Sequence, residues 1–202
     1  MCHRRQSSLY AATKKASESL SHTYASVHGV STTALRYFTV YGPYGRPDMA
    51  YFSFARSIAK GEEIVVFKGP DDSELERDMT YIDDIVDGTV AALDTAPKSG
   101  FPFSFRVYNL GSTQPVKVSE LVQSLEKHMS KAAKVRAEAL PNTGDVIRTH
   151  AEVGKARSEL GYEPRTSMDD GVKAFVQWFN RYFYNKEGEE RRSTSLRGYA
   201  PP

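Results

Sequence analysis

Hydrophobic residues recur at helical spacing near both ends of the chain. After Leu9, apolar positions three or four residues apart form one stripe: Ala12, Ala16, Leu20, Tyr24 and Val27. Gly29 follows as a natural helix stop. Ser167 precedes a longer, largely aromatic stripe: Met168, Val172, Phe175, Val176, Phe179, Tyr182 and Phe183. The spacing predicts two amphipathic helices, and the second stripe is typical of a helix that packs on a hydrophobic core.

Shorter patterns predict the elements between these helices. Val30 to Phe38 is rich in β-branched and aromatic residues and is expected to form a strand. A helix, a turn and then a strand favour an α/β layered fold. Similar patterns predict helices over 50–60, 83–93 and 151–160, a helix capped by Ser119, strands at 64–67 and 108–110, and loops over 41–47 and 140–150.

The composition is globular and excludes several classes of function. Of 202 residues, 40% are hydrophobic and 26% charged, and the net charge of +2 does not indicate a nucleic-acid-binding protein. The single cysteine excludes an internal disulfide, and the five histidines show no metal-ligand spacing. No apolar run reaches the roughly 18 residues that span a membrane. We therefore expect a soluble chain without a metal, with loosely ordered polar segments over 1–7 and from Asn185 onward.

Tyr10 and Lys14 lie four residues apart on the first predicted helix, so they share one face. A phenol is a poor base at neutral pH because it titrates near pH 10, and a close ammonium stabilises the phenolate. Such a pair can exchange a proton with a substrate hydroxyl. Taken alone, the spacing fits a solvated helix face equally well.

Further segments, which follow in a fixed order, make a functional interpretation of Tyr10 and Lys14 more specific. Residues 8–15, Ser-Leu-Tyr-Ala-Ala-Thr-Lys-Lys, resemble the active-site helix of the extended short-chain dehydrogenase/reductase family. Residues 35–50, which include Gly-Pro-Tyr-Gly-Arg-Pro-Asp-Met, resemble the strand and loop that follow it in UDP-glucuronate 4-epimerases. The remaining motifs of that family occur in order at 77–84, 108–111, 144–146 and 160–164. The resemblance extends from about Ser7 to Phe183.

The resemblance implies an α/β fold, the C-terminal part of an NAD(P)-binding Rossmann-type structure with a smaller substrate-binding α/β subdomain. No glycine-rich turn of the kind that binds a dinucleotide precedes Tyr10, so most of the dinucleotide-binding sheet is expected to be lacking. We expect a residual Rossmann portion over 1–42, a nucleotide-sugar region with returning Rossmann elements over 43–184, and a disordered tail over 185–202.

The same resemblance implies an NAD-dependent isomerase that converts UDP-glucuronate into UDP-galacturonate through a 4-keto intermediate. Tyr10 would take the proton of the sugar's 4-hydroxyl group, while NAD would accept hydride from C4. Lys14 would hold the nicotinamide ribose, and Phe38 would lie beside the nicotinamide, although a strand-end aromatic also fits a core position. The serine or threonine that shares the substrate proton in the family sits on the preceding strand, which is expected to be lacking here with most of the cofactor sheet.

The substrate carboxylate points to an arginine, because a planar guanidinium matches a carboxylate at two points. The resemblance implies that Arg46 and Thr39 hold this group, which matters because a 4-keto sugar acid readily loses CO2. Without the flanking match, Arg46 would be interpreted as a surface arginine. The family's tryptophan in this loop is Tyr44 here.

Three further residues are implied to contact the nucleotide. Arg77 would pair with the diphosphate of UDP; alternatively, it forms an ion pair with Asp78 or Asp83. Phe67 would lie beside the uracil ring, and core packing explains it equally well. Asp145 would lie near the nucleotide ribose or shape its own turn.

Other interpretations of the chain stay open. It is expected to be inactive alone, and a non-catalytic remnant of a nucleotide-sugar pocket fits the missing sheet. A UDP-glucose 4-epimerase or a nucleotide-sugar dehydratase is a further alternative, disfavoured by Arg46 and Thr39. Loss of the sheet is expected to expose the apolar face of the first helix, which invites association, and a homodimer is possible. The chain resembles plant-type members of the family, which are Golgi proteins held by an N-terminal membrane helix. That helix would lie in the part expected to be lacking here, so the compartment stays unknown.

Overall fold

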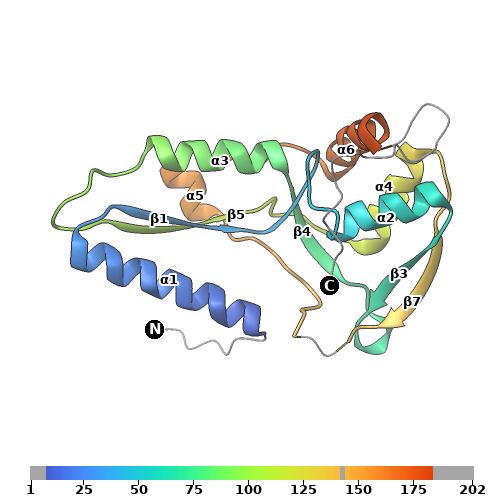
Figure 1. Ribbon diagram of the computed structural model, residues 1–202, viewed down its shortest axis with the longest axis horizontal. Helices are drawn as coiled ribbons and strands as arrows, with labels where there is room; N and C mark the ends of the chain where they lie inside the picture. The colour runs from blue at the N-terminus through green and yellow to red at the C-terminus, as the bar shows by residue number, and fades with distance from the viewer. Residues whose placement is uncertain (1–7, 142–143, 184–202) are drawn as a thin grey trace.

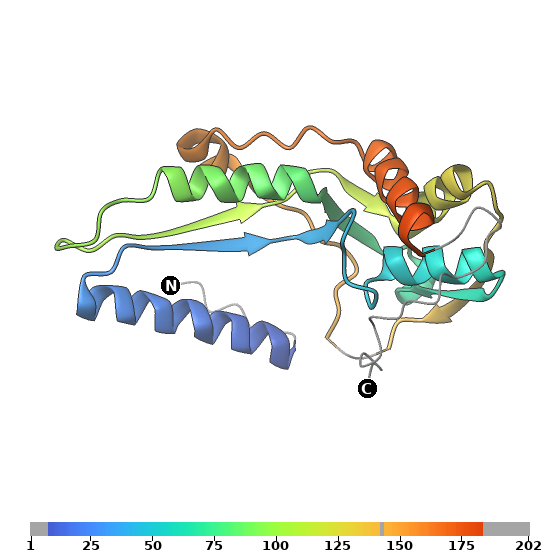
Figure 2. The ribbon, with the colours of Figure 1, turned by 45° about the horizontal axis from the view of Figure 1, so that its top comes forward.

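The computed structural model describes residues 8–141 and 144–183, and the predictions made for 1–7 and for the tail lie outside these residues. One half of the molecule is built on two parallel strands, β1 (Thr32–Tyr37) and β5 (Phe105–Leu110), which pair over their full lengths. The helix α1 (Leu9–His28) lies on one side of this pair, and α3 (Ile82–Asp94) and α5 (Gly154–Leu160) lie on the other (Figures 1 and 2).

The other half contains two further sheets. In the first, β2 (Thr39–Tyr41) is parallel and β6 (Pro115–Lys117) is antiparallel to the central strand β4 (Glu76–Tyr81). In the second, β3 (Glu63–Lys68) pairs in parallel with β7 (Lys134–Ala139). The described chain is thus an α/β structure, as the sequence predicts, and its strands form three small sheets (Figure 1).

Three helices, α2 (Ala50–Lys60), α4 (Val118–Met129) and α6 (Met168–Phe183), pack together beside the β2–β4–β6 sheet (Figure 1). A short 3₁₀ turn, Pro70–Asp72, follows β3. The core beneath the helices is strongly aromatic, as the stripe on α6 predicts. Its most buried members are Tyr41, Tyr51, Phe52, Ala55, Ile58, Leu125, Val172, Phe175, Val176 and Phe179.

A single residue, Phe38, connects the two halves between β1 and β2. Its backbone N–H donates to the carbonyl oxygen of Leu110 at 3.1 Å, which extends the β1–β5 pairing by one bond. Next along the chain, Thr39 lies beside Met79 of β4. The chain therefore passes from one sheet to another within two residues, and Phe38 and Thr39 lie at this junction.

Asp78, in the middle of β4, is a fully buried carboxylate that joins three segments. One oxygen, Oδ1, accepts from the Ser112 N–H at 2.7 Å and from the Ser112 hydroxyl at 3.0 Å. The other, Oδ2, accepts from the N–H groups of Thr113 at 3.1 Å and Ala151 at 2.8 Å. A buried charge is tolerated only when it is hydrogen-bonded in this way. The carboxylate therefore fixes the loops on both sides of β4.

The helices expected from hydrophobic spacing are all present, with errors at two helix starts. The helix expected over 151–160 begins only at Gly154. Ser119 does not cap α4, because β6 leads directly into the helix and Lys117 occupies the N-cap position. The Lys117 N–H is satisfied by the Glu120 carboxylate at 3.0 Å. The Ser119 hydroxyl instead donates to Glu74 at 2.9 Å.

The apolar stripe of α1 faces solvent, as expected if further structure is needed to cover it. Leu20, Tyr24 and Val27 are 70%, 62% and 63% exposed. A different face of the helix contacts β1, where Glu18 accepts two hydrogen bonds from Arg36, at 2.9 and 2.7 Å. The Arg36 guanidinium lowers the pKa of Glu18. In the described part of the chain, no helix is both long and apolar enough to cross a membrane.

The Asp78 network leads to a stability prediction. Asp78→Asn places an amide group opposite backbone N–H donors that need an acceptor, so we expect the free energy of unfolding to fall by about 3 kcal/mol. Urea denaturation of the 202-residue chain measures this change. The matched control is Asp87→Asn on the exposed face of α3, expected to change stability by no more than about 0.5 kcal/mol. Equal stability of the two variants would contradict a structural role for the carboxylate.

Candidate active site

The first turn of α1 presents the expected tyrosine and lysine together. Ser8 caps the helix, its hydroxyl oxygen accepting from the Ala11 N–H at 3.2 Å. The Lys14 Nζ atom lies 5.4 Å from the centre of the Tyr10 ring, and the Tyr10 side chain is 71% exposed. The predicted proximity of the two side chains is confirmed. Both are accessible from solvent on the same helix face.

The position of this pair follows from the chain's path. Gly29, in the left-handed conformation with φ of 64°, ends α1 and reverses the chain into β1. The helix and the strand then run in opposite directions, so the first turn of α1 lies toward the end of β1 (Figure 2). That end leads into Phe38 and Thr39, both half-buried. Phe38 packs against Gly111, where an added Cβ would lie 3.2 Å from the ring.

Arg77 is held by the loop that follows β7. Its guanidinium lies 3.1 Å from the Asp145 carboxylate and also donates to the carbonyl oxygens of Glu76 and Ile147, at 3.0 and 3.1 Å. The alternative ion pair with Asp78 or Asp83 is not the one observed. Two residues expected to bind the nucleotide are therefore adjacent, although 68 positions separate them in the sequence.

The loop that carries Arg46 leaves β2 and enters α2. Gly45 packs so closely on Tyr51 that an added Cβ would lie 1.6 Å from the Tyr51 hydroxyl oxygen. This hydroxyl donates to the carbonyl oxygen of Gly42 at 3.4 Å. Burial raises the pKa of the Tyr51 phenol to about 12, so the group remains a neutral donor. The base of the loop therefore rests on the core.

The Arg46 guanidinium contacts a carboxylate at two points. Its Nε lies 3.1 Å from Oδ1 of Asp48, and a terminal nitrogen lies 2.5 Å from Oδ2. The guanidinium lowers the pKa of Asp48. The Arg46 side chain is 74% exposed. The guanidinium thus pairs at two points with Asp48, and its expected contact with the sugar carboxylate stays a prediction. Asp48 was missed in the sequence, although a local Arg-Pro-Asp turn is a usable signal for such a pair.

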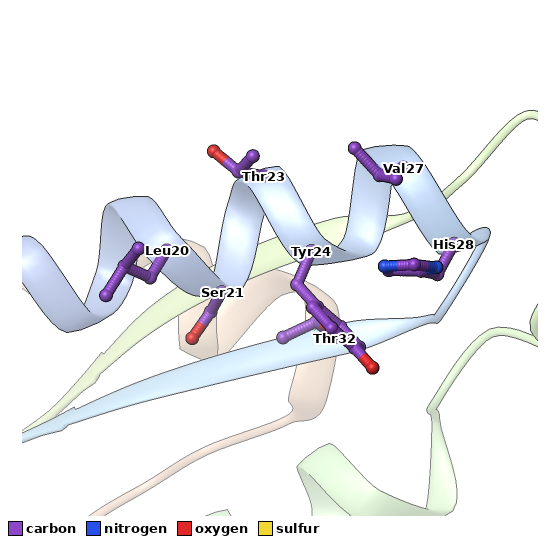
Figure 3. Close-up of a pocket in the computed structure, with 7 residues that line it drawn as sticks. All are labelled: Leu20, Ser21, Thr23, Tyr24, Val27, His28 and Thr32. Atoms are coloured by element: carbon purple, nitrogen blue, oxygen red, sulfur yellow. The ribbon is translucent and has the colours of Figure 1, made fainter.

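Two other features belong to other elements of the fold. Phe67 is 37% exposed on β3, in a different sheet from Thr39 and Arg77. A groove of about 500 Å³ runs along the solvent face of α1 and contains none of the expected site residues (Figure 3). It is lined by Leu20, Ser21, Thr23, Tyr24, Val27, His28 and Thr32. Within 8–141 and 144–183, no group of histidine, cysteine and acidic residues is arranged to hold a metal.

Comparison with known proteins identifies the family of this chain. Residues 2–111 match the NAD dependent epimerase/dehydratase family. Over 194 residues, the chain is 50% identical to UDP-glucuronate 4-epimerase 5 of Arabidopsis thaliana, covering 93% of this chain and 44% of that protein. UDP-glucuronate 4-epimerase 1 of the same plant is 48% identical over 190 residues, with 90% and 44% covered. The chain thus spans less than half the length of these relatives.

Solved structures show the same relationship. UDP-glucuronic acid 4-epimerase from Bacillus cereus, crystallised with UDP-glucuronic acid and NAD, is 34% identical with a TM-score of 0.75. UDP-glucose 4-epimerase from Thermotoga maritima, with UDP-glucose, is 28% identical with a TM-score of 0.74. Each alignment covers 85% of this chain, and it covers 52% of the first structure and 53% of the second. The α/β fold and the ordered motifs agree with these matches, and the chain belongs to the NAD dependent epimerase/dehydratase family.

Proposed function

We propose that this chain provides the acid–base pair and the substrate-binding residues of a UDP-glucuronate 4-epimerase, which forms UDP-galacturonate. The observation that carries the proposal is the contact between Lys14 and Tyr10 at the exposed start of α1. It occurs in a chain 50% identical to an Arabidopsis UDP-glucuronate 4-epimerase. The domain boundaries expected from the sequence, near residues 42 and 184, stay predictions.

Tyr10 is the proposed proton acceptor. Oxidation of the sugar at C4 removes the proton from the 4-hydroxyl oxygen and a hydride from C4 itself. The Tyr10 phenolate accepts that proton, and the phenol returns it when the 4-keto group is reduced from its other face. The Lys14 ammonium lies 5.4 Å from the ring centre, on the same face of α1. Both groups are accessible, so a substrate can approach them without rearrangement of the helix.

The residues near this pair fit the chemistry of NAD. The Lys14 ammonium suits the hydroxyl groups of the nicotinamide ribose, and the half-buried Phe38 offers an aromatic surface at the end of β1. When bound, NAD supplies the hydride acceptor at C4. The chain's own residues position the sugar and move the proton.

Substrate selection is assigned to the other expected residues. Arg46 and Thr39 bind the sugar carboxylate, and Asp48 supports this role because it already engages the guanidinium at two points. A carboxylate held in this way is kept out of the alignment that releases CO2 from a 4-keto sugar acid. Arg77 binds the diphosphate, with Asp145 beside it near the ribose. Phe67 is proposed to lie beside the uracil ring.

The partner of α1 is proposed to be a second copy of this chain. Three apolar side chains on one face, Leu20, Tyr24 and Val27, are each more than 60% exposed, and such a contiguous stripe favours association. The groove in Figure 3 runs along the same face and can receive side chains from another helix. The compartment stays open.

The catalytic assignment is tested in a chimera. The 202-residue chain alone is expected to give no turnover with NAD+ and UDP-glucuronate, because it spans only 44% of the length of UDP-glucuronate 4-epimerase 5. Fused in place of the matching part of Arabidopsis UDP-glucuronate 4-epimerase 5, it is expected to form UDP-galacturonate. Tyr10→Phe in the chimera should lower kcat by about 10²–10⁴-fold and leave KM nearly unchanged.

Chromatography of the UDP-sugars measures this reaction, and Tyr24→Phe on the same helix is the matched control. An active Tyr10→Phe chimera would remove Tyr10 from its role. Conversion of UDP-glucose without UDP-glucuronate would favour the second candidate, a UDP-glucose 4-epimerase. An inactive parent chimera that is folded would favour a non-catalytic remnant.

Arg46 is tested by substrate preference. Arg46→Ala in the chimera should lower kcat/KM for UDP-glucuronate by about 10–100-fold, because a charge-assisted pair to the carboxylate is lost. Activity with UDP-glucose, which lacks the carboxylate, should change little, and CO2 release per turnover should rise. Arg56→Ala, at an exposed arginine on α2, is the control. Equal losses for both sugars would rule out recognition of the carboxylate by Arg46.

Self-association is tested on the 202-residue chain by sedimentation velocity. The parent chain is expected to sediment as a dimer, and Leu20→Glu with Val27→Glu should shift it to the monomer, because a charge in an apolar interface is costly. Val90→Glu, at a valine 48% exposed on α3, should leave the dimer intact. A monomeric parent chain would contradict the proposed interface.

A further inference from the structure

An aromatic contact connects the Arg46 loop to α6. Tyr44 lies two residues before Arg46, and its ring centre is 5.2 Å from that of Trp178 and 6.1 Å from that of Tyr182. Trp178 and Tyr182 are four residues apart on α6, so both rings lie on one helix face, 5.7 Å apart. We call these three residues, Tyr44, Trp178 and Tyr182, the aromatic clamp.

The clamp is anchored in the core. The Trp178 ring centre lies 6.0 Å from that of Phe175 and 6.2 Å from that of Phe52, both buried. The indole Nε1 is buried and has no hydrogen-bond partner among the described residues. Ring contacts therefore hold Trp178 in the core, and the Tyr44 hydroxyl adds a polar interaction with Tyr182 and Trp178. The chain of rings runs without interruption from the core to the exposed loop.

The backbone at Tyr44 indicates that the contact has a role beyond filling space. Tyr44 has a φ of 61°, a left-handed conformation that is uncommon for a bulky residue. Such a conformation persists when the surrounding contacts compensate for it. The Tyr44 side chain is nevertheless 77% exposed, so core burial does not provide that compensation. The ring contacts with Trp178 and Tyr182 provide the compensation instead.

The loop is thus held on two sides. Gly45 packs closely on Tyr51, and Tyr44 packs on the two α6 rings. Arg46 follows directly, and its carbonyl oxygen accepts from the Met49 N–H at 3.2 Å as the chain turns into α2. Contacts on both sides of the backbone restrict where the Arg46 guanidinium can reach.

We propose that Tyr44 is a positioning residue that acts through Arg46. The aromatic clamp fixes the loop on α6 and thereby sets the preference for a sugar that carries a carboxylate. The proposal rests on the proposed function for the identity of that sugar. The clamp itself can be tested without it, because Trp178 is the only tryptophan in the chain and its fluorescence reports on the contact.

The first measurement uses the 202-residue chain alone. Tyr44→Gly removes the ring and tolerates the positive φ, while Tyr44→Phe keeps the ring. Tyr44→Gly should shift Trp178 emission to longer wavelength and increase its quenching by acrylamide, and Tyr44→Phe should match the parent chain. Identical fluorescence of all three proteins would overturn the clamp, whatever sugar the enzyme uses.

The second measurement uses the chimera. Tyr44→Gly should lower kcat/KM for UDP-glucuronate by about 10–100-fold, as expected for a misplaced binding group, chiefly by raising KM. UDP-glucose should be affected much less, and Tyr44→Phe should restore the parent value. In a chimera that already carries Arg46→Ala, Tyr44→Gly should not lower kcat/KM for UDP-glucuronate any further, because its effect passes through Arg46. Additive losses, or equal losses for both sugars, would overturn the positioning role.

Tyr182→Ala provides a second route should Tyr44→Gly fail to fold. It removes a ring of the clamp from α6, leaves the loop sequence unchanged, and should alter preference in the same direction. An unchanged preference in Tyr182→Ala would count against the clamp. A parent chimera without activity on UDP-glucuronate would contradict the proposed function instead. The fluorescence measurement would still show whether Tyr44 contacts Trp178.

Discussion

The buried carboxylate of Asp78 is the interaction on which most of the arrangement depends. It accepts backbone hydrogen bonds from segments 34, 35 and 73 residues away, and so joins β4 to the loop after β5 and to the segment before α5. The backbone N–H of Asp78 donates to the hydroxyl oxygen of Thr149 at 2.9 Å. Because an unpaired buried charge is very costly, these segments have few alternatives to their observed positions.

The candidate substrate residues inherit their positions from this network. Arg77 precedes Asp78 in β4, and the loop with Asp145 runs beside the same strand, where the Glu76 N–H donates to the Ile147 carbonyl oxygen at 2.9 Å. Fixing Asp78 therefore fixes both members of the Arg77–Asp145 pair. The site is supported by a group that does not itself contact substrate in the proposed mechanism.

Local patterns made the helices and the contact between one candidate pair predictable. Tyr10 and Lys14 are adjacent because helical geometry alone brings positions four apart together. The strands were harder. β4, which reads Glu-Arg-Asp-Met-Thr-Tyr, contains three charged residues, and β7 is largely exposed, so neither shows the apolar run expected of a strand. Both exist because of partners far away in the sequence, which a local pattern does not contain.

The arginine contacts show the same limit. The sequence predicted roles for Arg77 and Asp145 separately, but their contact depends on 68 intervening residues folding back. The Arg46–Asp48 pair was missed although it is local, because either residue alone fits a surface loop. The clamp was missed for a different reason: the α6 stripe was interpreted as core, and Trp178 and Tyr182 extend that core onto the surface.

The two candidate anion-binding arginines share a further property. Each guanidinium already contacts a carboxylate of the chain, Arg46 with Asp48 and Arg77 with Asp145. The Arg46–Asp48 pair is largely exposed to solvent, and such a pair contributes little to stability, so an incoming carboxylate would displace Asp48 at low cost. The Arg77 side chain, in contrast, is only 18% exposed. In the proposed function, Asp48 and Asp145 occupy the places that the carboxylate and the diphosphate of the substrate would take. The Arg46 pair depends in addition on the clamp, because a guanidinium can be oriented only as well as the loop that carries it.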